Sequence, residues 1–391
     1  MSTQNGSGGT PLVISRVETF VLRLDADGHP TSARPMYRTI FDRGTLYADL
    51  TETVLVRVET EDGAVGWGES LAPVGPRVTA AVIDDVLSPI ILGQDAGRTR
   101  WLHSRMQESM RERGHLTGFQ ADGIAGVDIA LWDLVGRARG LSVSALLGGA
   151  FRTEIPTYVS SIAGDTIEER AETIQQLRDA GARRFKLHLG HGVRDDLAAF
   201  DRIRELVPDV ELAVDVHGVY SLPQALDLAR GLFERHAWFL ESALPPENLD
   251  DFARLADAAD IALAAGEAMR NRFEAAAWIA RDAVHIYQPD VGRTGISEAW
   301  TIAAMANAAS RPVMPHHSLA LGPALAAGMH IAATTQLMPS FEYQIGAVHN
   351  ANGLLACPLD VSAGHMVLPA GAGLGIEVLE DEIRAAALGT R

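Results

Sequence analysis

Three carboxylates close three short apolar runs in the second half of this chain. Asp215 ends VELAVD, Glu241 ends AWFLE and Glu267 ends IALAAGE, and the two steps between them are equal (241 − 215 = 26 and 267 − 241 = 26). An acidic residue that ends an apolar run, three times over, predicts three strands that carry carboxylates to one end of a sheet. Three hard oxygen ligands in one place suit Mg²⁺. The spacing therefore predicts both an architecture and a metal site.

The segment from about residue 154 to residue 345 repeats a strand-like and then a helix-like pattern. RRFKLHL, for example, is followed by the amphipathic DDLAAFDRIRELV and then by VELAVDV. Eight candidate strands fall in this span, and their number and spacing favour a closed parallel barrel over an open sheet. No Gly-x-Gly-x-x-Gly follows a predicted strand, which argues against a dinucleotide-binding fold.

Ahead of this repeat, strands come first and helices follow. Residues 12–24 and 53–60 alternate like strands, and the turn Glu61-Asp62-Gly63 before AVGWGES predicts a hairpin. From about 77 to 147 the apolar residues have helical spacing, and Gly140 closes one helix. The first third of the chain is therefore expected to be α+β.

These changes of pattern divide the chain into four parts. Residues 1–11 are polar and glycine-rich and are expected to form a disordered lead-in. Residues 12–150 form the α+β domain, and residues 151–355 form the barrel. Residues 356–391 are rich in glycine and proline and end in the helical EDEIRAAALG. We expect this tail to pack back on the first domain.

Charge and composition narrow the classes of partner. The formal net charge is −17 with no Lys/Arg cluster to offset it, so nucleic acid is a poor partner. No run of about 18 uncharged apolar residues occurs, so we expect no membrane span. The N-terminus lacks the pattern of a signal peptide. Cys357 is the single cysteine, which excludes an intrachain disulfide and fits a reducing, cytoplasmic location.

Ionisable residues also stand at the ends of the other predicted strands. The equal step recurs along the last three strands (316 − 290 = 26 and 342 − 316 = 26). Residues i and i+2 of a strand point the same way, so Lys-x-His and Asp-x-His can each share one face. So many ionisable groups at one end of a barrel would repel one another or lie buried at high cost without a ligand. The set consists of Lys186, His188, His217, Asp290, His316, His317 and Glu342.

Together with three further segments, these residues resemble the enolase superfamily in its mandelate racemase subgroup. The segments are GAVGWGE (63–69), GVDIALWDLVGRARGLSVSALLGG (126–149) and QPDVGRTG (288–295). The resemblance covers the chain from about residue 12 to the end. It implies an α/β fold, a modified (β/α)₇β TIM-type barrel with an N-terminal α+β capping domain. It also implies one Mg²⁺ per subunit, held by Asp215, Glu241 and Glu267.

The resemblance further implies roles for the remaining strand-end residues. Asp290 would orient His316, the general base. In the alternative register, His317 would take the place of His316. Glu342 would hydrogen-bond the developing enediolate. Lys186 would supply positive charge. His188 stands where the subgroup commonly has Lys, so it is either a second base or a substrate contact. His217 stands where Asn is common, and Asp-x-His is similar to acid-sugar dehydratases such as galactonate dehydratase, in which this His is the general acid.

The expected activity is therefore dehydration of a sugar acid, an aldonate or an aldarate, through an enediolate to a 2-keto-3-deoxy acid. A racemase, an epimerase or a sugar-lactone cycloisomerase of the same subgroup is the alternative. A metal-dependent sugar-acid binding protein is the alternative from another class. The expected substrate contacts are Tyr37, Arg38, Trp67 and His317. A surface arginine without a functional role is an equally good interpretation of Arg38. The expected partners are a small-molecule sugar acid and further copies of the chain.

Overall fold

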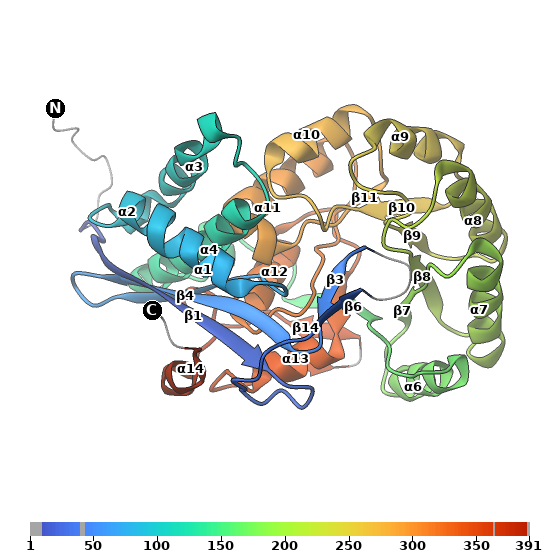
Figure 1. Cartoon of the computed structure of the whole chain (residues 1–391), viewed down its shortest axis with the longest axis horizontal. Coiled ribbons are helices and arrows are strands. Elements are labelled where there is room, and N and C mark those ends of the chain that lie inside the picture. The colour runs from blue at the N-terminus through green and yellow to red at the C-terminus, as the bar shows by residue number, and fades with distance from the viewer. Residues whose placement is uncertain (1–9, 40–43, 363, 389–391) are drawn as a thin grey trace.

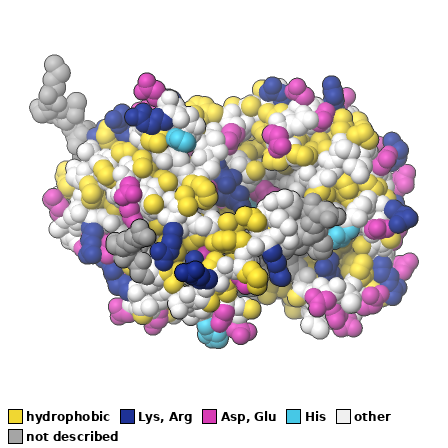
Figure 2. All heavy atoms as spheres, in the orientation of Figure 1, with side chains coloured by type: hydrophobic (Ala, Val, Ile, Leu, Met, Phe, Trp, Pro, Cys, Tyr) yellow, Lys and Arg dark blue, Asp and Glu magenta, His cyan; other side chains and the backbone are white. Residues whose placement is uncertain are grey.

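The computed structural model describes residues 10–39, 44–362 and 364–388. Most of the expected lead-in, residues 1–9, lies outside the described residues. Figure 1 shows two neighbouring parts, one built on the strands and helices of the first third and the other on a ring of alternating strands and helices. No helix in the described ranges is both long and apolar enough to cross a membrane. On the face seen in Figure 2, acidic and basic side chains are interspersed.

The first part is a three-stranded antiparallel sheet covered by helices. Strand β1 (Ile14–Leu24) pairs with β4 (Thr51–Thr60), which pairs with β5 (Val65–Ser70), so the predicted hairpin is confirmed. The long helix α4 (Phe119–Arg139) crosses β5 so closely that a Cβ at Gly68 would lie 2.0 Å from the carbonyl oxygen of Gly126. The glycines of GWGE therefore permit this contact. The smaller elements are β2 (Tyr37–Thr39), β3 (Leu46–Ala48), α1 (Pro76–Val82), α2 (Ser88–Ile91), α3 (Thr99–Ser109) and α5 (Val143–Leu146).

The second part is the predicted parallel barrel with its outer helices. Its strands follow one another in sequence order, and the last strand pairs with the first, which brings the two ends of the repeat together. The strands are β6 (Glu154–Ser160), β7 (Arg184–His188), β8 (Glu211–Asp215), β9 (Phe239–Glu241), β10 (Ala262–Ala265), β11 (Ile286–Tyr287) and β12 (Phe341–Gln344). The helices are α6 (Ile167–Asp179), α7 (Val193–Leu206), α8 (Leu222–Glu234), α9 (Leu249–Ala258), α10 (Arg272–Ala280), α11 (Val291–Ala308) and α12 (Pro323–Thr334).

The seventh predicted strand is reduced to two isolated parallel bridges. Tyr287 pairs with Val313, and Asp290 pairs with His316. Pro312 and Pro315 lie in this segment, and proline has no N–H to donate to a ladder. The segment still runs beside β11, so it carries His316 to the same end of the barrel as the other strand-end residues.

The last part of the chain contacts both domains. It contains α13 (Ile345–Asn352), β13 (Val361–Ser362), β14 (His365–Val367) and α14 (Glu380–Ala386). Strand β14 pairs antiparallel with β6 of the barrel. Helix α14 lies by β1, where Arg384 Nη2 is 3.0 Å from Glu18 and the Leu388 N–H donates to Val21 O at 2.9 Å. Figure 1 shows α14 beside the capping sheet.

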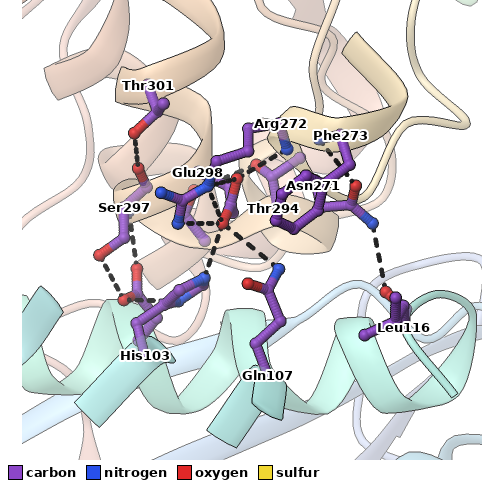
Figure 3. Close-up of polar contacts among 12 residues, drawn as sticks. His103, Gln107, Leu116, Asn271, Arg272, Phe273, Thr294, Ser297, Glu298 and Thr301 are labelled. Carbon is purple, nitrogen blue, oxygen red and sulfur yellow. Dashed lines mark hydrogen bonds and ion pairs between the residues drawn. The ribbon is translucent and has the colours of Figure 1, made fainter. Parts of the chain in front are cut away.

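A buried polar network joins the capping helices to the barrel (Figure 3). His103 on α3 lies 3.1 Å from Asp128 on α4 and 3.1 Å from Glu298 on α11. Arg272, the first residue of α10, approaches Glu298 to 2.6 Å. Burial alone would lower the pKa of His103, but Asp128 and Glu298 raise it to about 9. The imidazolium thus bridges two carboxylates across the domain interface.

This network predicts a loss of stability in alkaline solution. The folded pKa of His103 lies near 9, above the ordinary 6.5, so its contribution is full below pH 6.5 and is lost as pH rises through 9. The shift corresponds to about 3 kcal/mol. Denaturant unfolding of His103→Gln and the parent protein should therefore differ most at pH 6 and least near pH 10. A difference in unfolding free energy that does not narrow as pH rises would contradict this prediction. His29→Gln is the control, because His29 is an exposed histidine beside Asp25. We expect it to change the unfolding free energy by no more than about 0.5 kcal/mol.

Candidate active site

The three carboxylates that open the repeat lie at one end of neighbouring strands. Asp215 and Glu241 are the last residues of β8 and β9 and are direct partners across them. Glu267 comes two residues after β10. The Asp215 and Glu241 side chains are buried, and the Glu267 side chain is 30% exposed. The predicted convergence at the carboxyl ends of these strands is therefore present in the fold.

The loop after Glu267 is fastened to the capping domain. Arg270 Nε donates to Asp122 at 2.8 Å, and the Asn271 amide donates to the carbonyl oxygen of Leu116 at 3.2 Å. Figure 3 shows Asn271 reaching toward Leu116 of the capping domain, whereas Arg272 binds Glu298 on α11. The position of Glu267 thus depends on the contact between the two domains.

The electrostatics of the carboxylates fit a divalent cation. Burial, together with the neighbouring carboxylates, raises the pKa of Asp215 to about 6 and that of Glu241 to about 7, against the lowering effect of Lys186. Buried carboxylates short of positive charge and offering oxygen donors are a suitable set for Mg²⁺. Asp215, Glu241 and Glu267 are nevertheless not among the groups of described residues whose ligand atoms all lie within 4.8 Å of one another. Holding one ion would therefore require these side chains to turn toward each other.

Lys186 is the only lysine in the sequence and lies in the middle of these carboxylates. Its Nζ is 2.6 Å from Glu241 Oε1, 2.9 Å from Glu342 Oε1 and 3.8 Å from Asp215 Oδ2. Its side chain is 1% exposed. Burial would lower the pKa of Lys186, but Glu241 and Glu342 hold it well above the usual range. Lys186 is therefore a fixed positive charge rather than a proton acceptor at neutral pH.

His316 and Asp290 form a close pair on the opposite side of the ring of strand ends. His316 Nδ1 lies 2.6 Å from Asp290 Oδ2, while its Nε2 lies 3.2 Å from Glu267 and 3.9 Å from Glu342. Burial would lower the pKa of His316, but Glu342, Asp290 and Glu267 raise it to about 9. Asp290 also caps α11 by accepting the Gly292 N–H at 2.8 Å, which fixes the carboxylate.

His317 is buried beside the dyad but does not join it. Its backbone N–H donates to Glu342 at 3.3 Å, and its ring lies near the backbone of Ala320. Burial lowers the pKa of His317 to about 4, so the ring is neutral. In this structure it is His316, not His317, that contacts Asp290.

His188 and His217 stand together over Asp215. The two ring centroids are 5.1 Å apart, and each imidazole has a nitrogen within 3.8 Å of an Asp215 oxygen. A cavity of about 410 Å³ opens beside them and is lined by His217, Glu267 and apolar side chains that include Phe252 and Trp278. His217, the predicted acid, and Glu267, one of the three predicted metal ligands, therefore face a space that a small molecule can enter.

The capping residues are divided between the surface and the core. Tyr37 is partly exposed on β2 and donates to Glu52 at 2.7 Å, and Arg38 is exposed beside it. Trp67 is only 5% exposed and packs on Phe20 at 5.5 Å between ring centroids. Its surroundings are those of a core residue, so contact between Trp67 and a substrate stays a prediction that this packing does not support.

Two polar residues that the sequence reasoning passed over support the site. Gln288 donates from Nε2 to Glu241 Oε2 at 2.6 Å, so both Glu241 oxygens are engaged. It lies two residues before Asp290, and the i and i+2 rule that paired Lys186 with His188 could have found it. Glu69 of the capping domain accepts the N–H groups of Leu321 and Ala324, at 2.7 and 3.1 Å, and so holds the loop that follows His317.

Comparison with known protein families covers both parts of the chain. Residues 41–148 match the mandelate racemase / muconate lactonizing enzyme N-terminal domain, and residues 169–382 match the enolase C-terminal domain-like family. The D-galactarolactone cycloisomerase of Agrobacterium fabrum is 31% identical, over 88% of this chain and 94% of its own. The arabinonate dehydratase of Saccharolobus solfataricus is 32% identical, over 84% and 88%. A D-galactonate dehydratase of Verminephrobacter eiseniae is 34% identical, over 79% and 82%.

Solved structures match the fold over nearly its full length. A member of the enolase superfamily from Agrobacterium tumefaciens has a TM-score of 0.90 at 30% identity and covers 96% of this chain and 99% of its own. A racemase from Streptomyces coelicolor with bound magnesium has a TM-score of 0.84 at 22% identity, over 96% and 100%, and shows the fold alone. Because the family matches include both domains, this chain belongs to the enolase superfamily, with an N-terminal domain of the mandelate racemase and muconate lactonizing type.

Proposed function

We propose that this protein is a Mg²⁺-dependent dehydratase of a sugar acid, an aldonate or an aldarate, that forms a 2-keto-3-deoxy acid. The observation that carries the proposal is the geometry of two histidines at one end of the barrel. His316 is paired with Asp290 at 2.6 Å, and His217 lies 3.4 Å from Asp215. One can take a proton from C2, and the other can deliver a proton to a leaving hydroxyl. Relatives that are named arabinonate dehydratase and D-galactonate dehydratase support this reaction class.

The binding groups are the carboxylates and the buried lysine. Asp215, Glu241 and Glu267 would hold Mg²⁺, which when bound offsets the charge of the substrate carboxylate and of the enediolate. Lys186 adds a fixed positive charge beside the same position. Glu342, held 2.9 Å from Lys186, would lie near the enediolate oxygen.

Proton transfer is assigned to the histidines. Asp290 accepts the Nδ1–H of His316, which leaves the lone pair on Nε2 to take the C2 proton. His316 must be neutral for this step, and Glu267 contributes to its raised pKa. A cation on Glu267 would remove that contribution and lower the pKa of His316. His217 then protonates the 3-hydroxyl, and water leaves. His188 serves either as a substrate contact or as the base on the opposite face.

Substrate contacts from the capping domain are part of the same proposal. Arg38 would pair with a distal carboxylate of a diacid substrate, and Tyr37 lies next to it on β2. From the barrel, His317 would hydrogen-bond a substrate hydroxyl through its neutral, buried ring. A buried polar group gains most from such a ligand because leaving it unpaired is costly.

A second candidate is a lactone cycloisomerase or an epimerase that uses the same proton abstraction. The D-galactarolactone cycloisomerase relative favours it, since that protein matches 88% of this chain. The two reactions diverge after the C2 proton has left. A dehydratase loses the 3-hydroxyl, whereas an epimerase returns a proton to C2 and a cycloisomerase breaks the lactone ring.

Incubation with Mg²⁺ and a library of sugar mono- and diacids in D₂O tests the proposal. We expect a 2-keto-3-deoxy acid from at least one substrate, no product after chelation, and recovery on adding Mg²⁺. Asp215→Asn is the matched control, expected to lose the product together with the metal response. Deuterium at C2 with the hydroxyl retained would assign an epimerase instead. Turnover confined to lactones would assign a cycloisomerase.

A further inference from the structure

The cluster of His188, Asp215 and His217 differs in chemistry from the three carboxylates. One ligand atom of each residue lies within 4.8 Å of the other two. His217 Nδ1 is 3.4 Å from Asp215 Oδ1, and His188 Nε2 is 3.8 Å from Asp215 Oδ2. Ligand atoms around a tetrahedral metal with bonds of 2.0–2.2 Å are roughly 3.3–3.6 Å apart. The His217–Asp215 distance lies in this range and the His188–Asp215 distance is slightly longer, each to a different oxygen of Asp215, so small side-chain movements would bring the three residues around one metal ion.

The backbone holds this arrangement in place. His217 has a φ of 50°, in the left-handed region, which disfavours a non-glycine residue by roughly 1 kcal/mol. Its N–H donates to Asp215 Oδ1 at 2.9 Å, and the Gly218 N–H donates to Ser242 O at 2.5 Å. The strained residue thus places its imidazole over Asp215, and strain of this kind gathers at functional sites.

The cluster is also accessible and lies in a negatively charged surrounding. The side chains of His188 and His217 are 32% and 24% exposed, whereas that of Asp215 is 4% exposed. The cavity of about 410 Å³ reaches His217 and Glu267. Glu241 and Glu342 lie deeper, with Lys186 as their positive partner. A dication in the cavity can therefore reach the His217 imidazole and the Glu267 carboxylate.

We propose that His188, Asp215 and His217 form a second cation site that takes a divalent transition-metal ion such as Zn²⁺ or Co²⁺. Imidazole nitrogen suits these ions, whereas Mg²⁺ prefers an all-oxygen set. Asp215 belongs both to this cluster and to the three carboxylates, so an ion at this site competes with Mg²⁺. The ion also occupies imidazole nitrogens that proton transfer needs. Zn²⁺ is therefore an inhibitor of the Mg²⁺-dependent reaction. The binding itself does not rest on the proposed dehydration, since it concerns the resting protein.

Titration of the Mg²⁺-free protein with Co²⁺ tests the site without any turnover. We expect a visible absorption band that saturates at one equivalent and that Zn²⁺ abolishes by displacement. His188→Gln and His217→Gln should each weaken Co²⁺ binding by about 100-fold, since even outer partners of metal ligands change affinity by 10–100-fold. His191→Gln, at an exposed histidine of the loop that follows β7, is the matched control and should leave binding unchanged. Excess Mg²⁺ should raise the apparent Kd for Co²⁺.

The same titration separates this site from the carboxylate site. Glu241→Gln and Glu267→Gln should retain the Co²⁺ band even where they abolish Mg²⁺-dependent turnover. No band in the parent protein, or a band lost only in these two variants, overturns the proposal. A Zn²⁺-soaked crystal gives the answer if a histidine variant does not fold. An anomalous peak bonded to His188, Asp215 and His217 supports the site, and a peak elsewhere or none at all overturns it.

Discussion

His316→Asn is expected to lower kcat/KM for the sugar-acid substrate by about 10³-fold or more. His316 Nε2 faces Glu267 at 3.2 Å and Glu342 at 3.9 Å, while Nδ1 is held by Asp290 at 2.6 Å. Asparagine can keep a hydrogen bond to Asp290, but it has no group that accepts a proton near neutral pH. The measurement is initial-rate formation of 2-keto-3-deoxy acid, with C2 deuterium exchange followed in the same samples.

The neighbouring histidine provides the matched control. His317 is also buried, yet it has no contact with Asp290, so His317→Asn should raise KM and leave kcat within about tenfold. Asp290→Asn should lower kcat and shift the pH profile, because it acts through the orientation and charge of His316. Loss of exchange in His317→Asn with exchange retained in His316→Asn would reverse the assignment of the base.

Lys186→Met is expected to destabilise the fold by about 3–5 kcal/mol and to abolish turnover. Lys186 is 1% exposed and approaches Glu241 to 2.6 Å and Glu342 to 2.9 Å. Removing the cation that pairs with both Glu241 and Glu342 leaves buried charge without its nearest partner, which is why the expected loss is large. Denaturant unfolding of the purified variant measures it, with Mg²⁺ removed so that no added cation substitutes for the lysine.

Arg184→Met, two residues earlier on the same strand, is the control for this change. Arg184 pairs with Glu211 at 2.6 Å, but the two side chains are 34% and 54% exposed, so the expected loss is within about 1 kcal/mol. The double variant Lys186→Met/Glu342→Gln should recover part of the stability, because one unpaired charge is removed with the lysine. If Lys186→Met and Arg184→Met lost equal stability, burial of the charge would not be the cause of the destabilisation.

The regular spacing made the barrel predictable. Alternation of period two and amphipathic helices of fixed length are local properties, so the strand ends that carry Asp215, Glu241 and Glu342 could be located without coordinates. The same rules predict a full seventh strand, and prolines reduce it to two bridges. These two bridges form because the segment lies between neighbouring strands of the barrel. A local sequence pattern carries no information about such neighbours.

Other residues depend on partners that are distant in the chain. Trp67 lies in the GAVGWGE segment and is predicted to contact the substrate, but in the fold it packs on Phe20 from another strand. Gln288 is uncharged and so lies outside the set of ionisable strand-end residues, although it donates a hydrogen bond to Glu241. His103 became important only when α3 packed against α11 and brought Glu298 within 3.1 Å. None of these contacts follows from local periodicity, because each joins residues from separate elements.

The three evenly spaced carboxylates by themselves predicted three strands that converge on a cation, and the strand–helix repeat from about residue 154 to residue 345 predicted the parallel barrel. The resemblance of the strand-end residues to the enolase superfamily further implied proton transfer beside a metal. Tertiary packing decided how these groups divide. Glu241 is committed to Lys186 and Gln288, Glu267 lies against His316, and Asp215 lies against His188 and His217. The physical reason is that spacing along the chain sets which strand end a group occupies, whereas its partners are set by side-chain distances and burial across the ring.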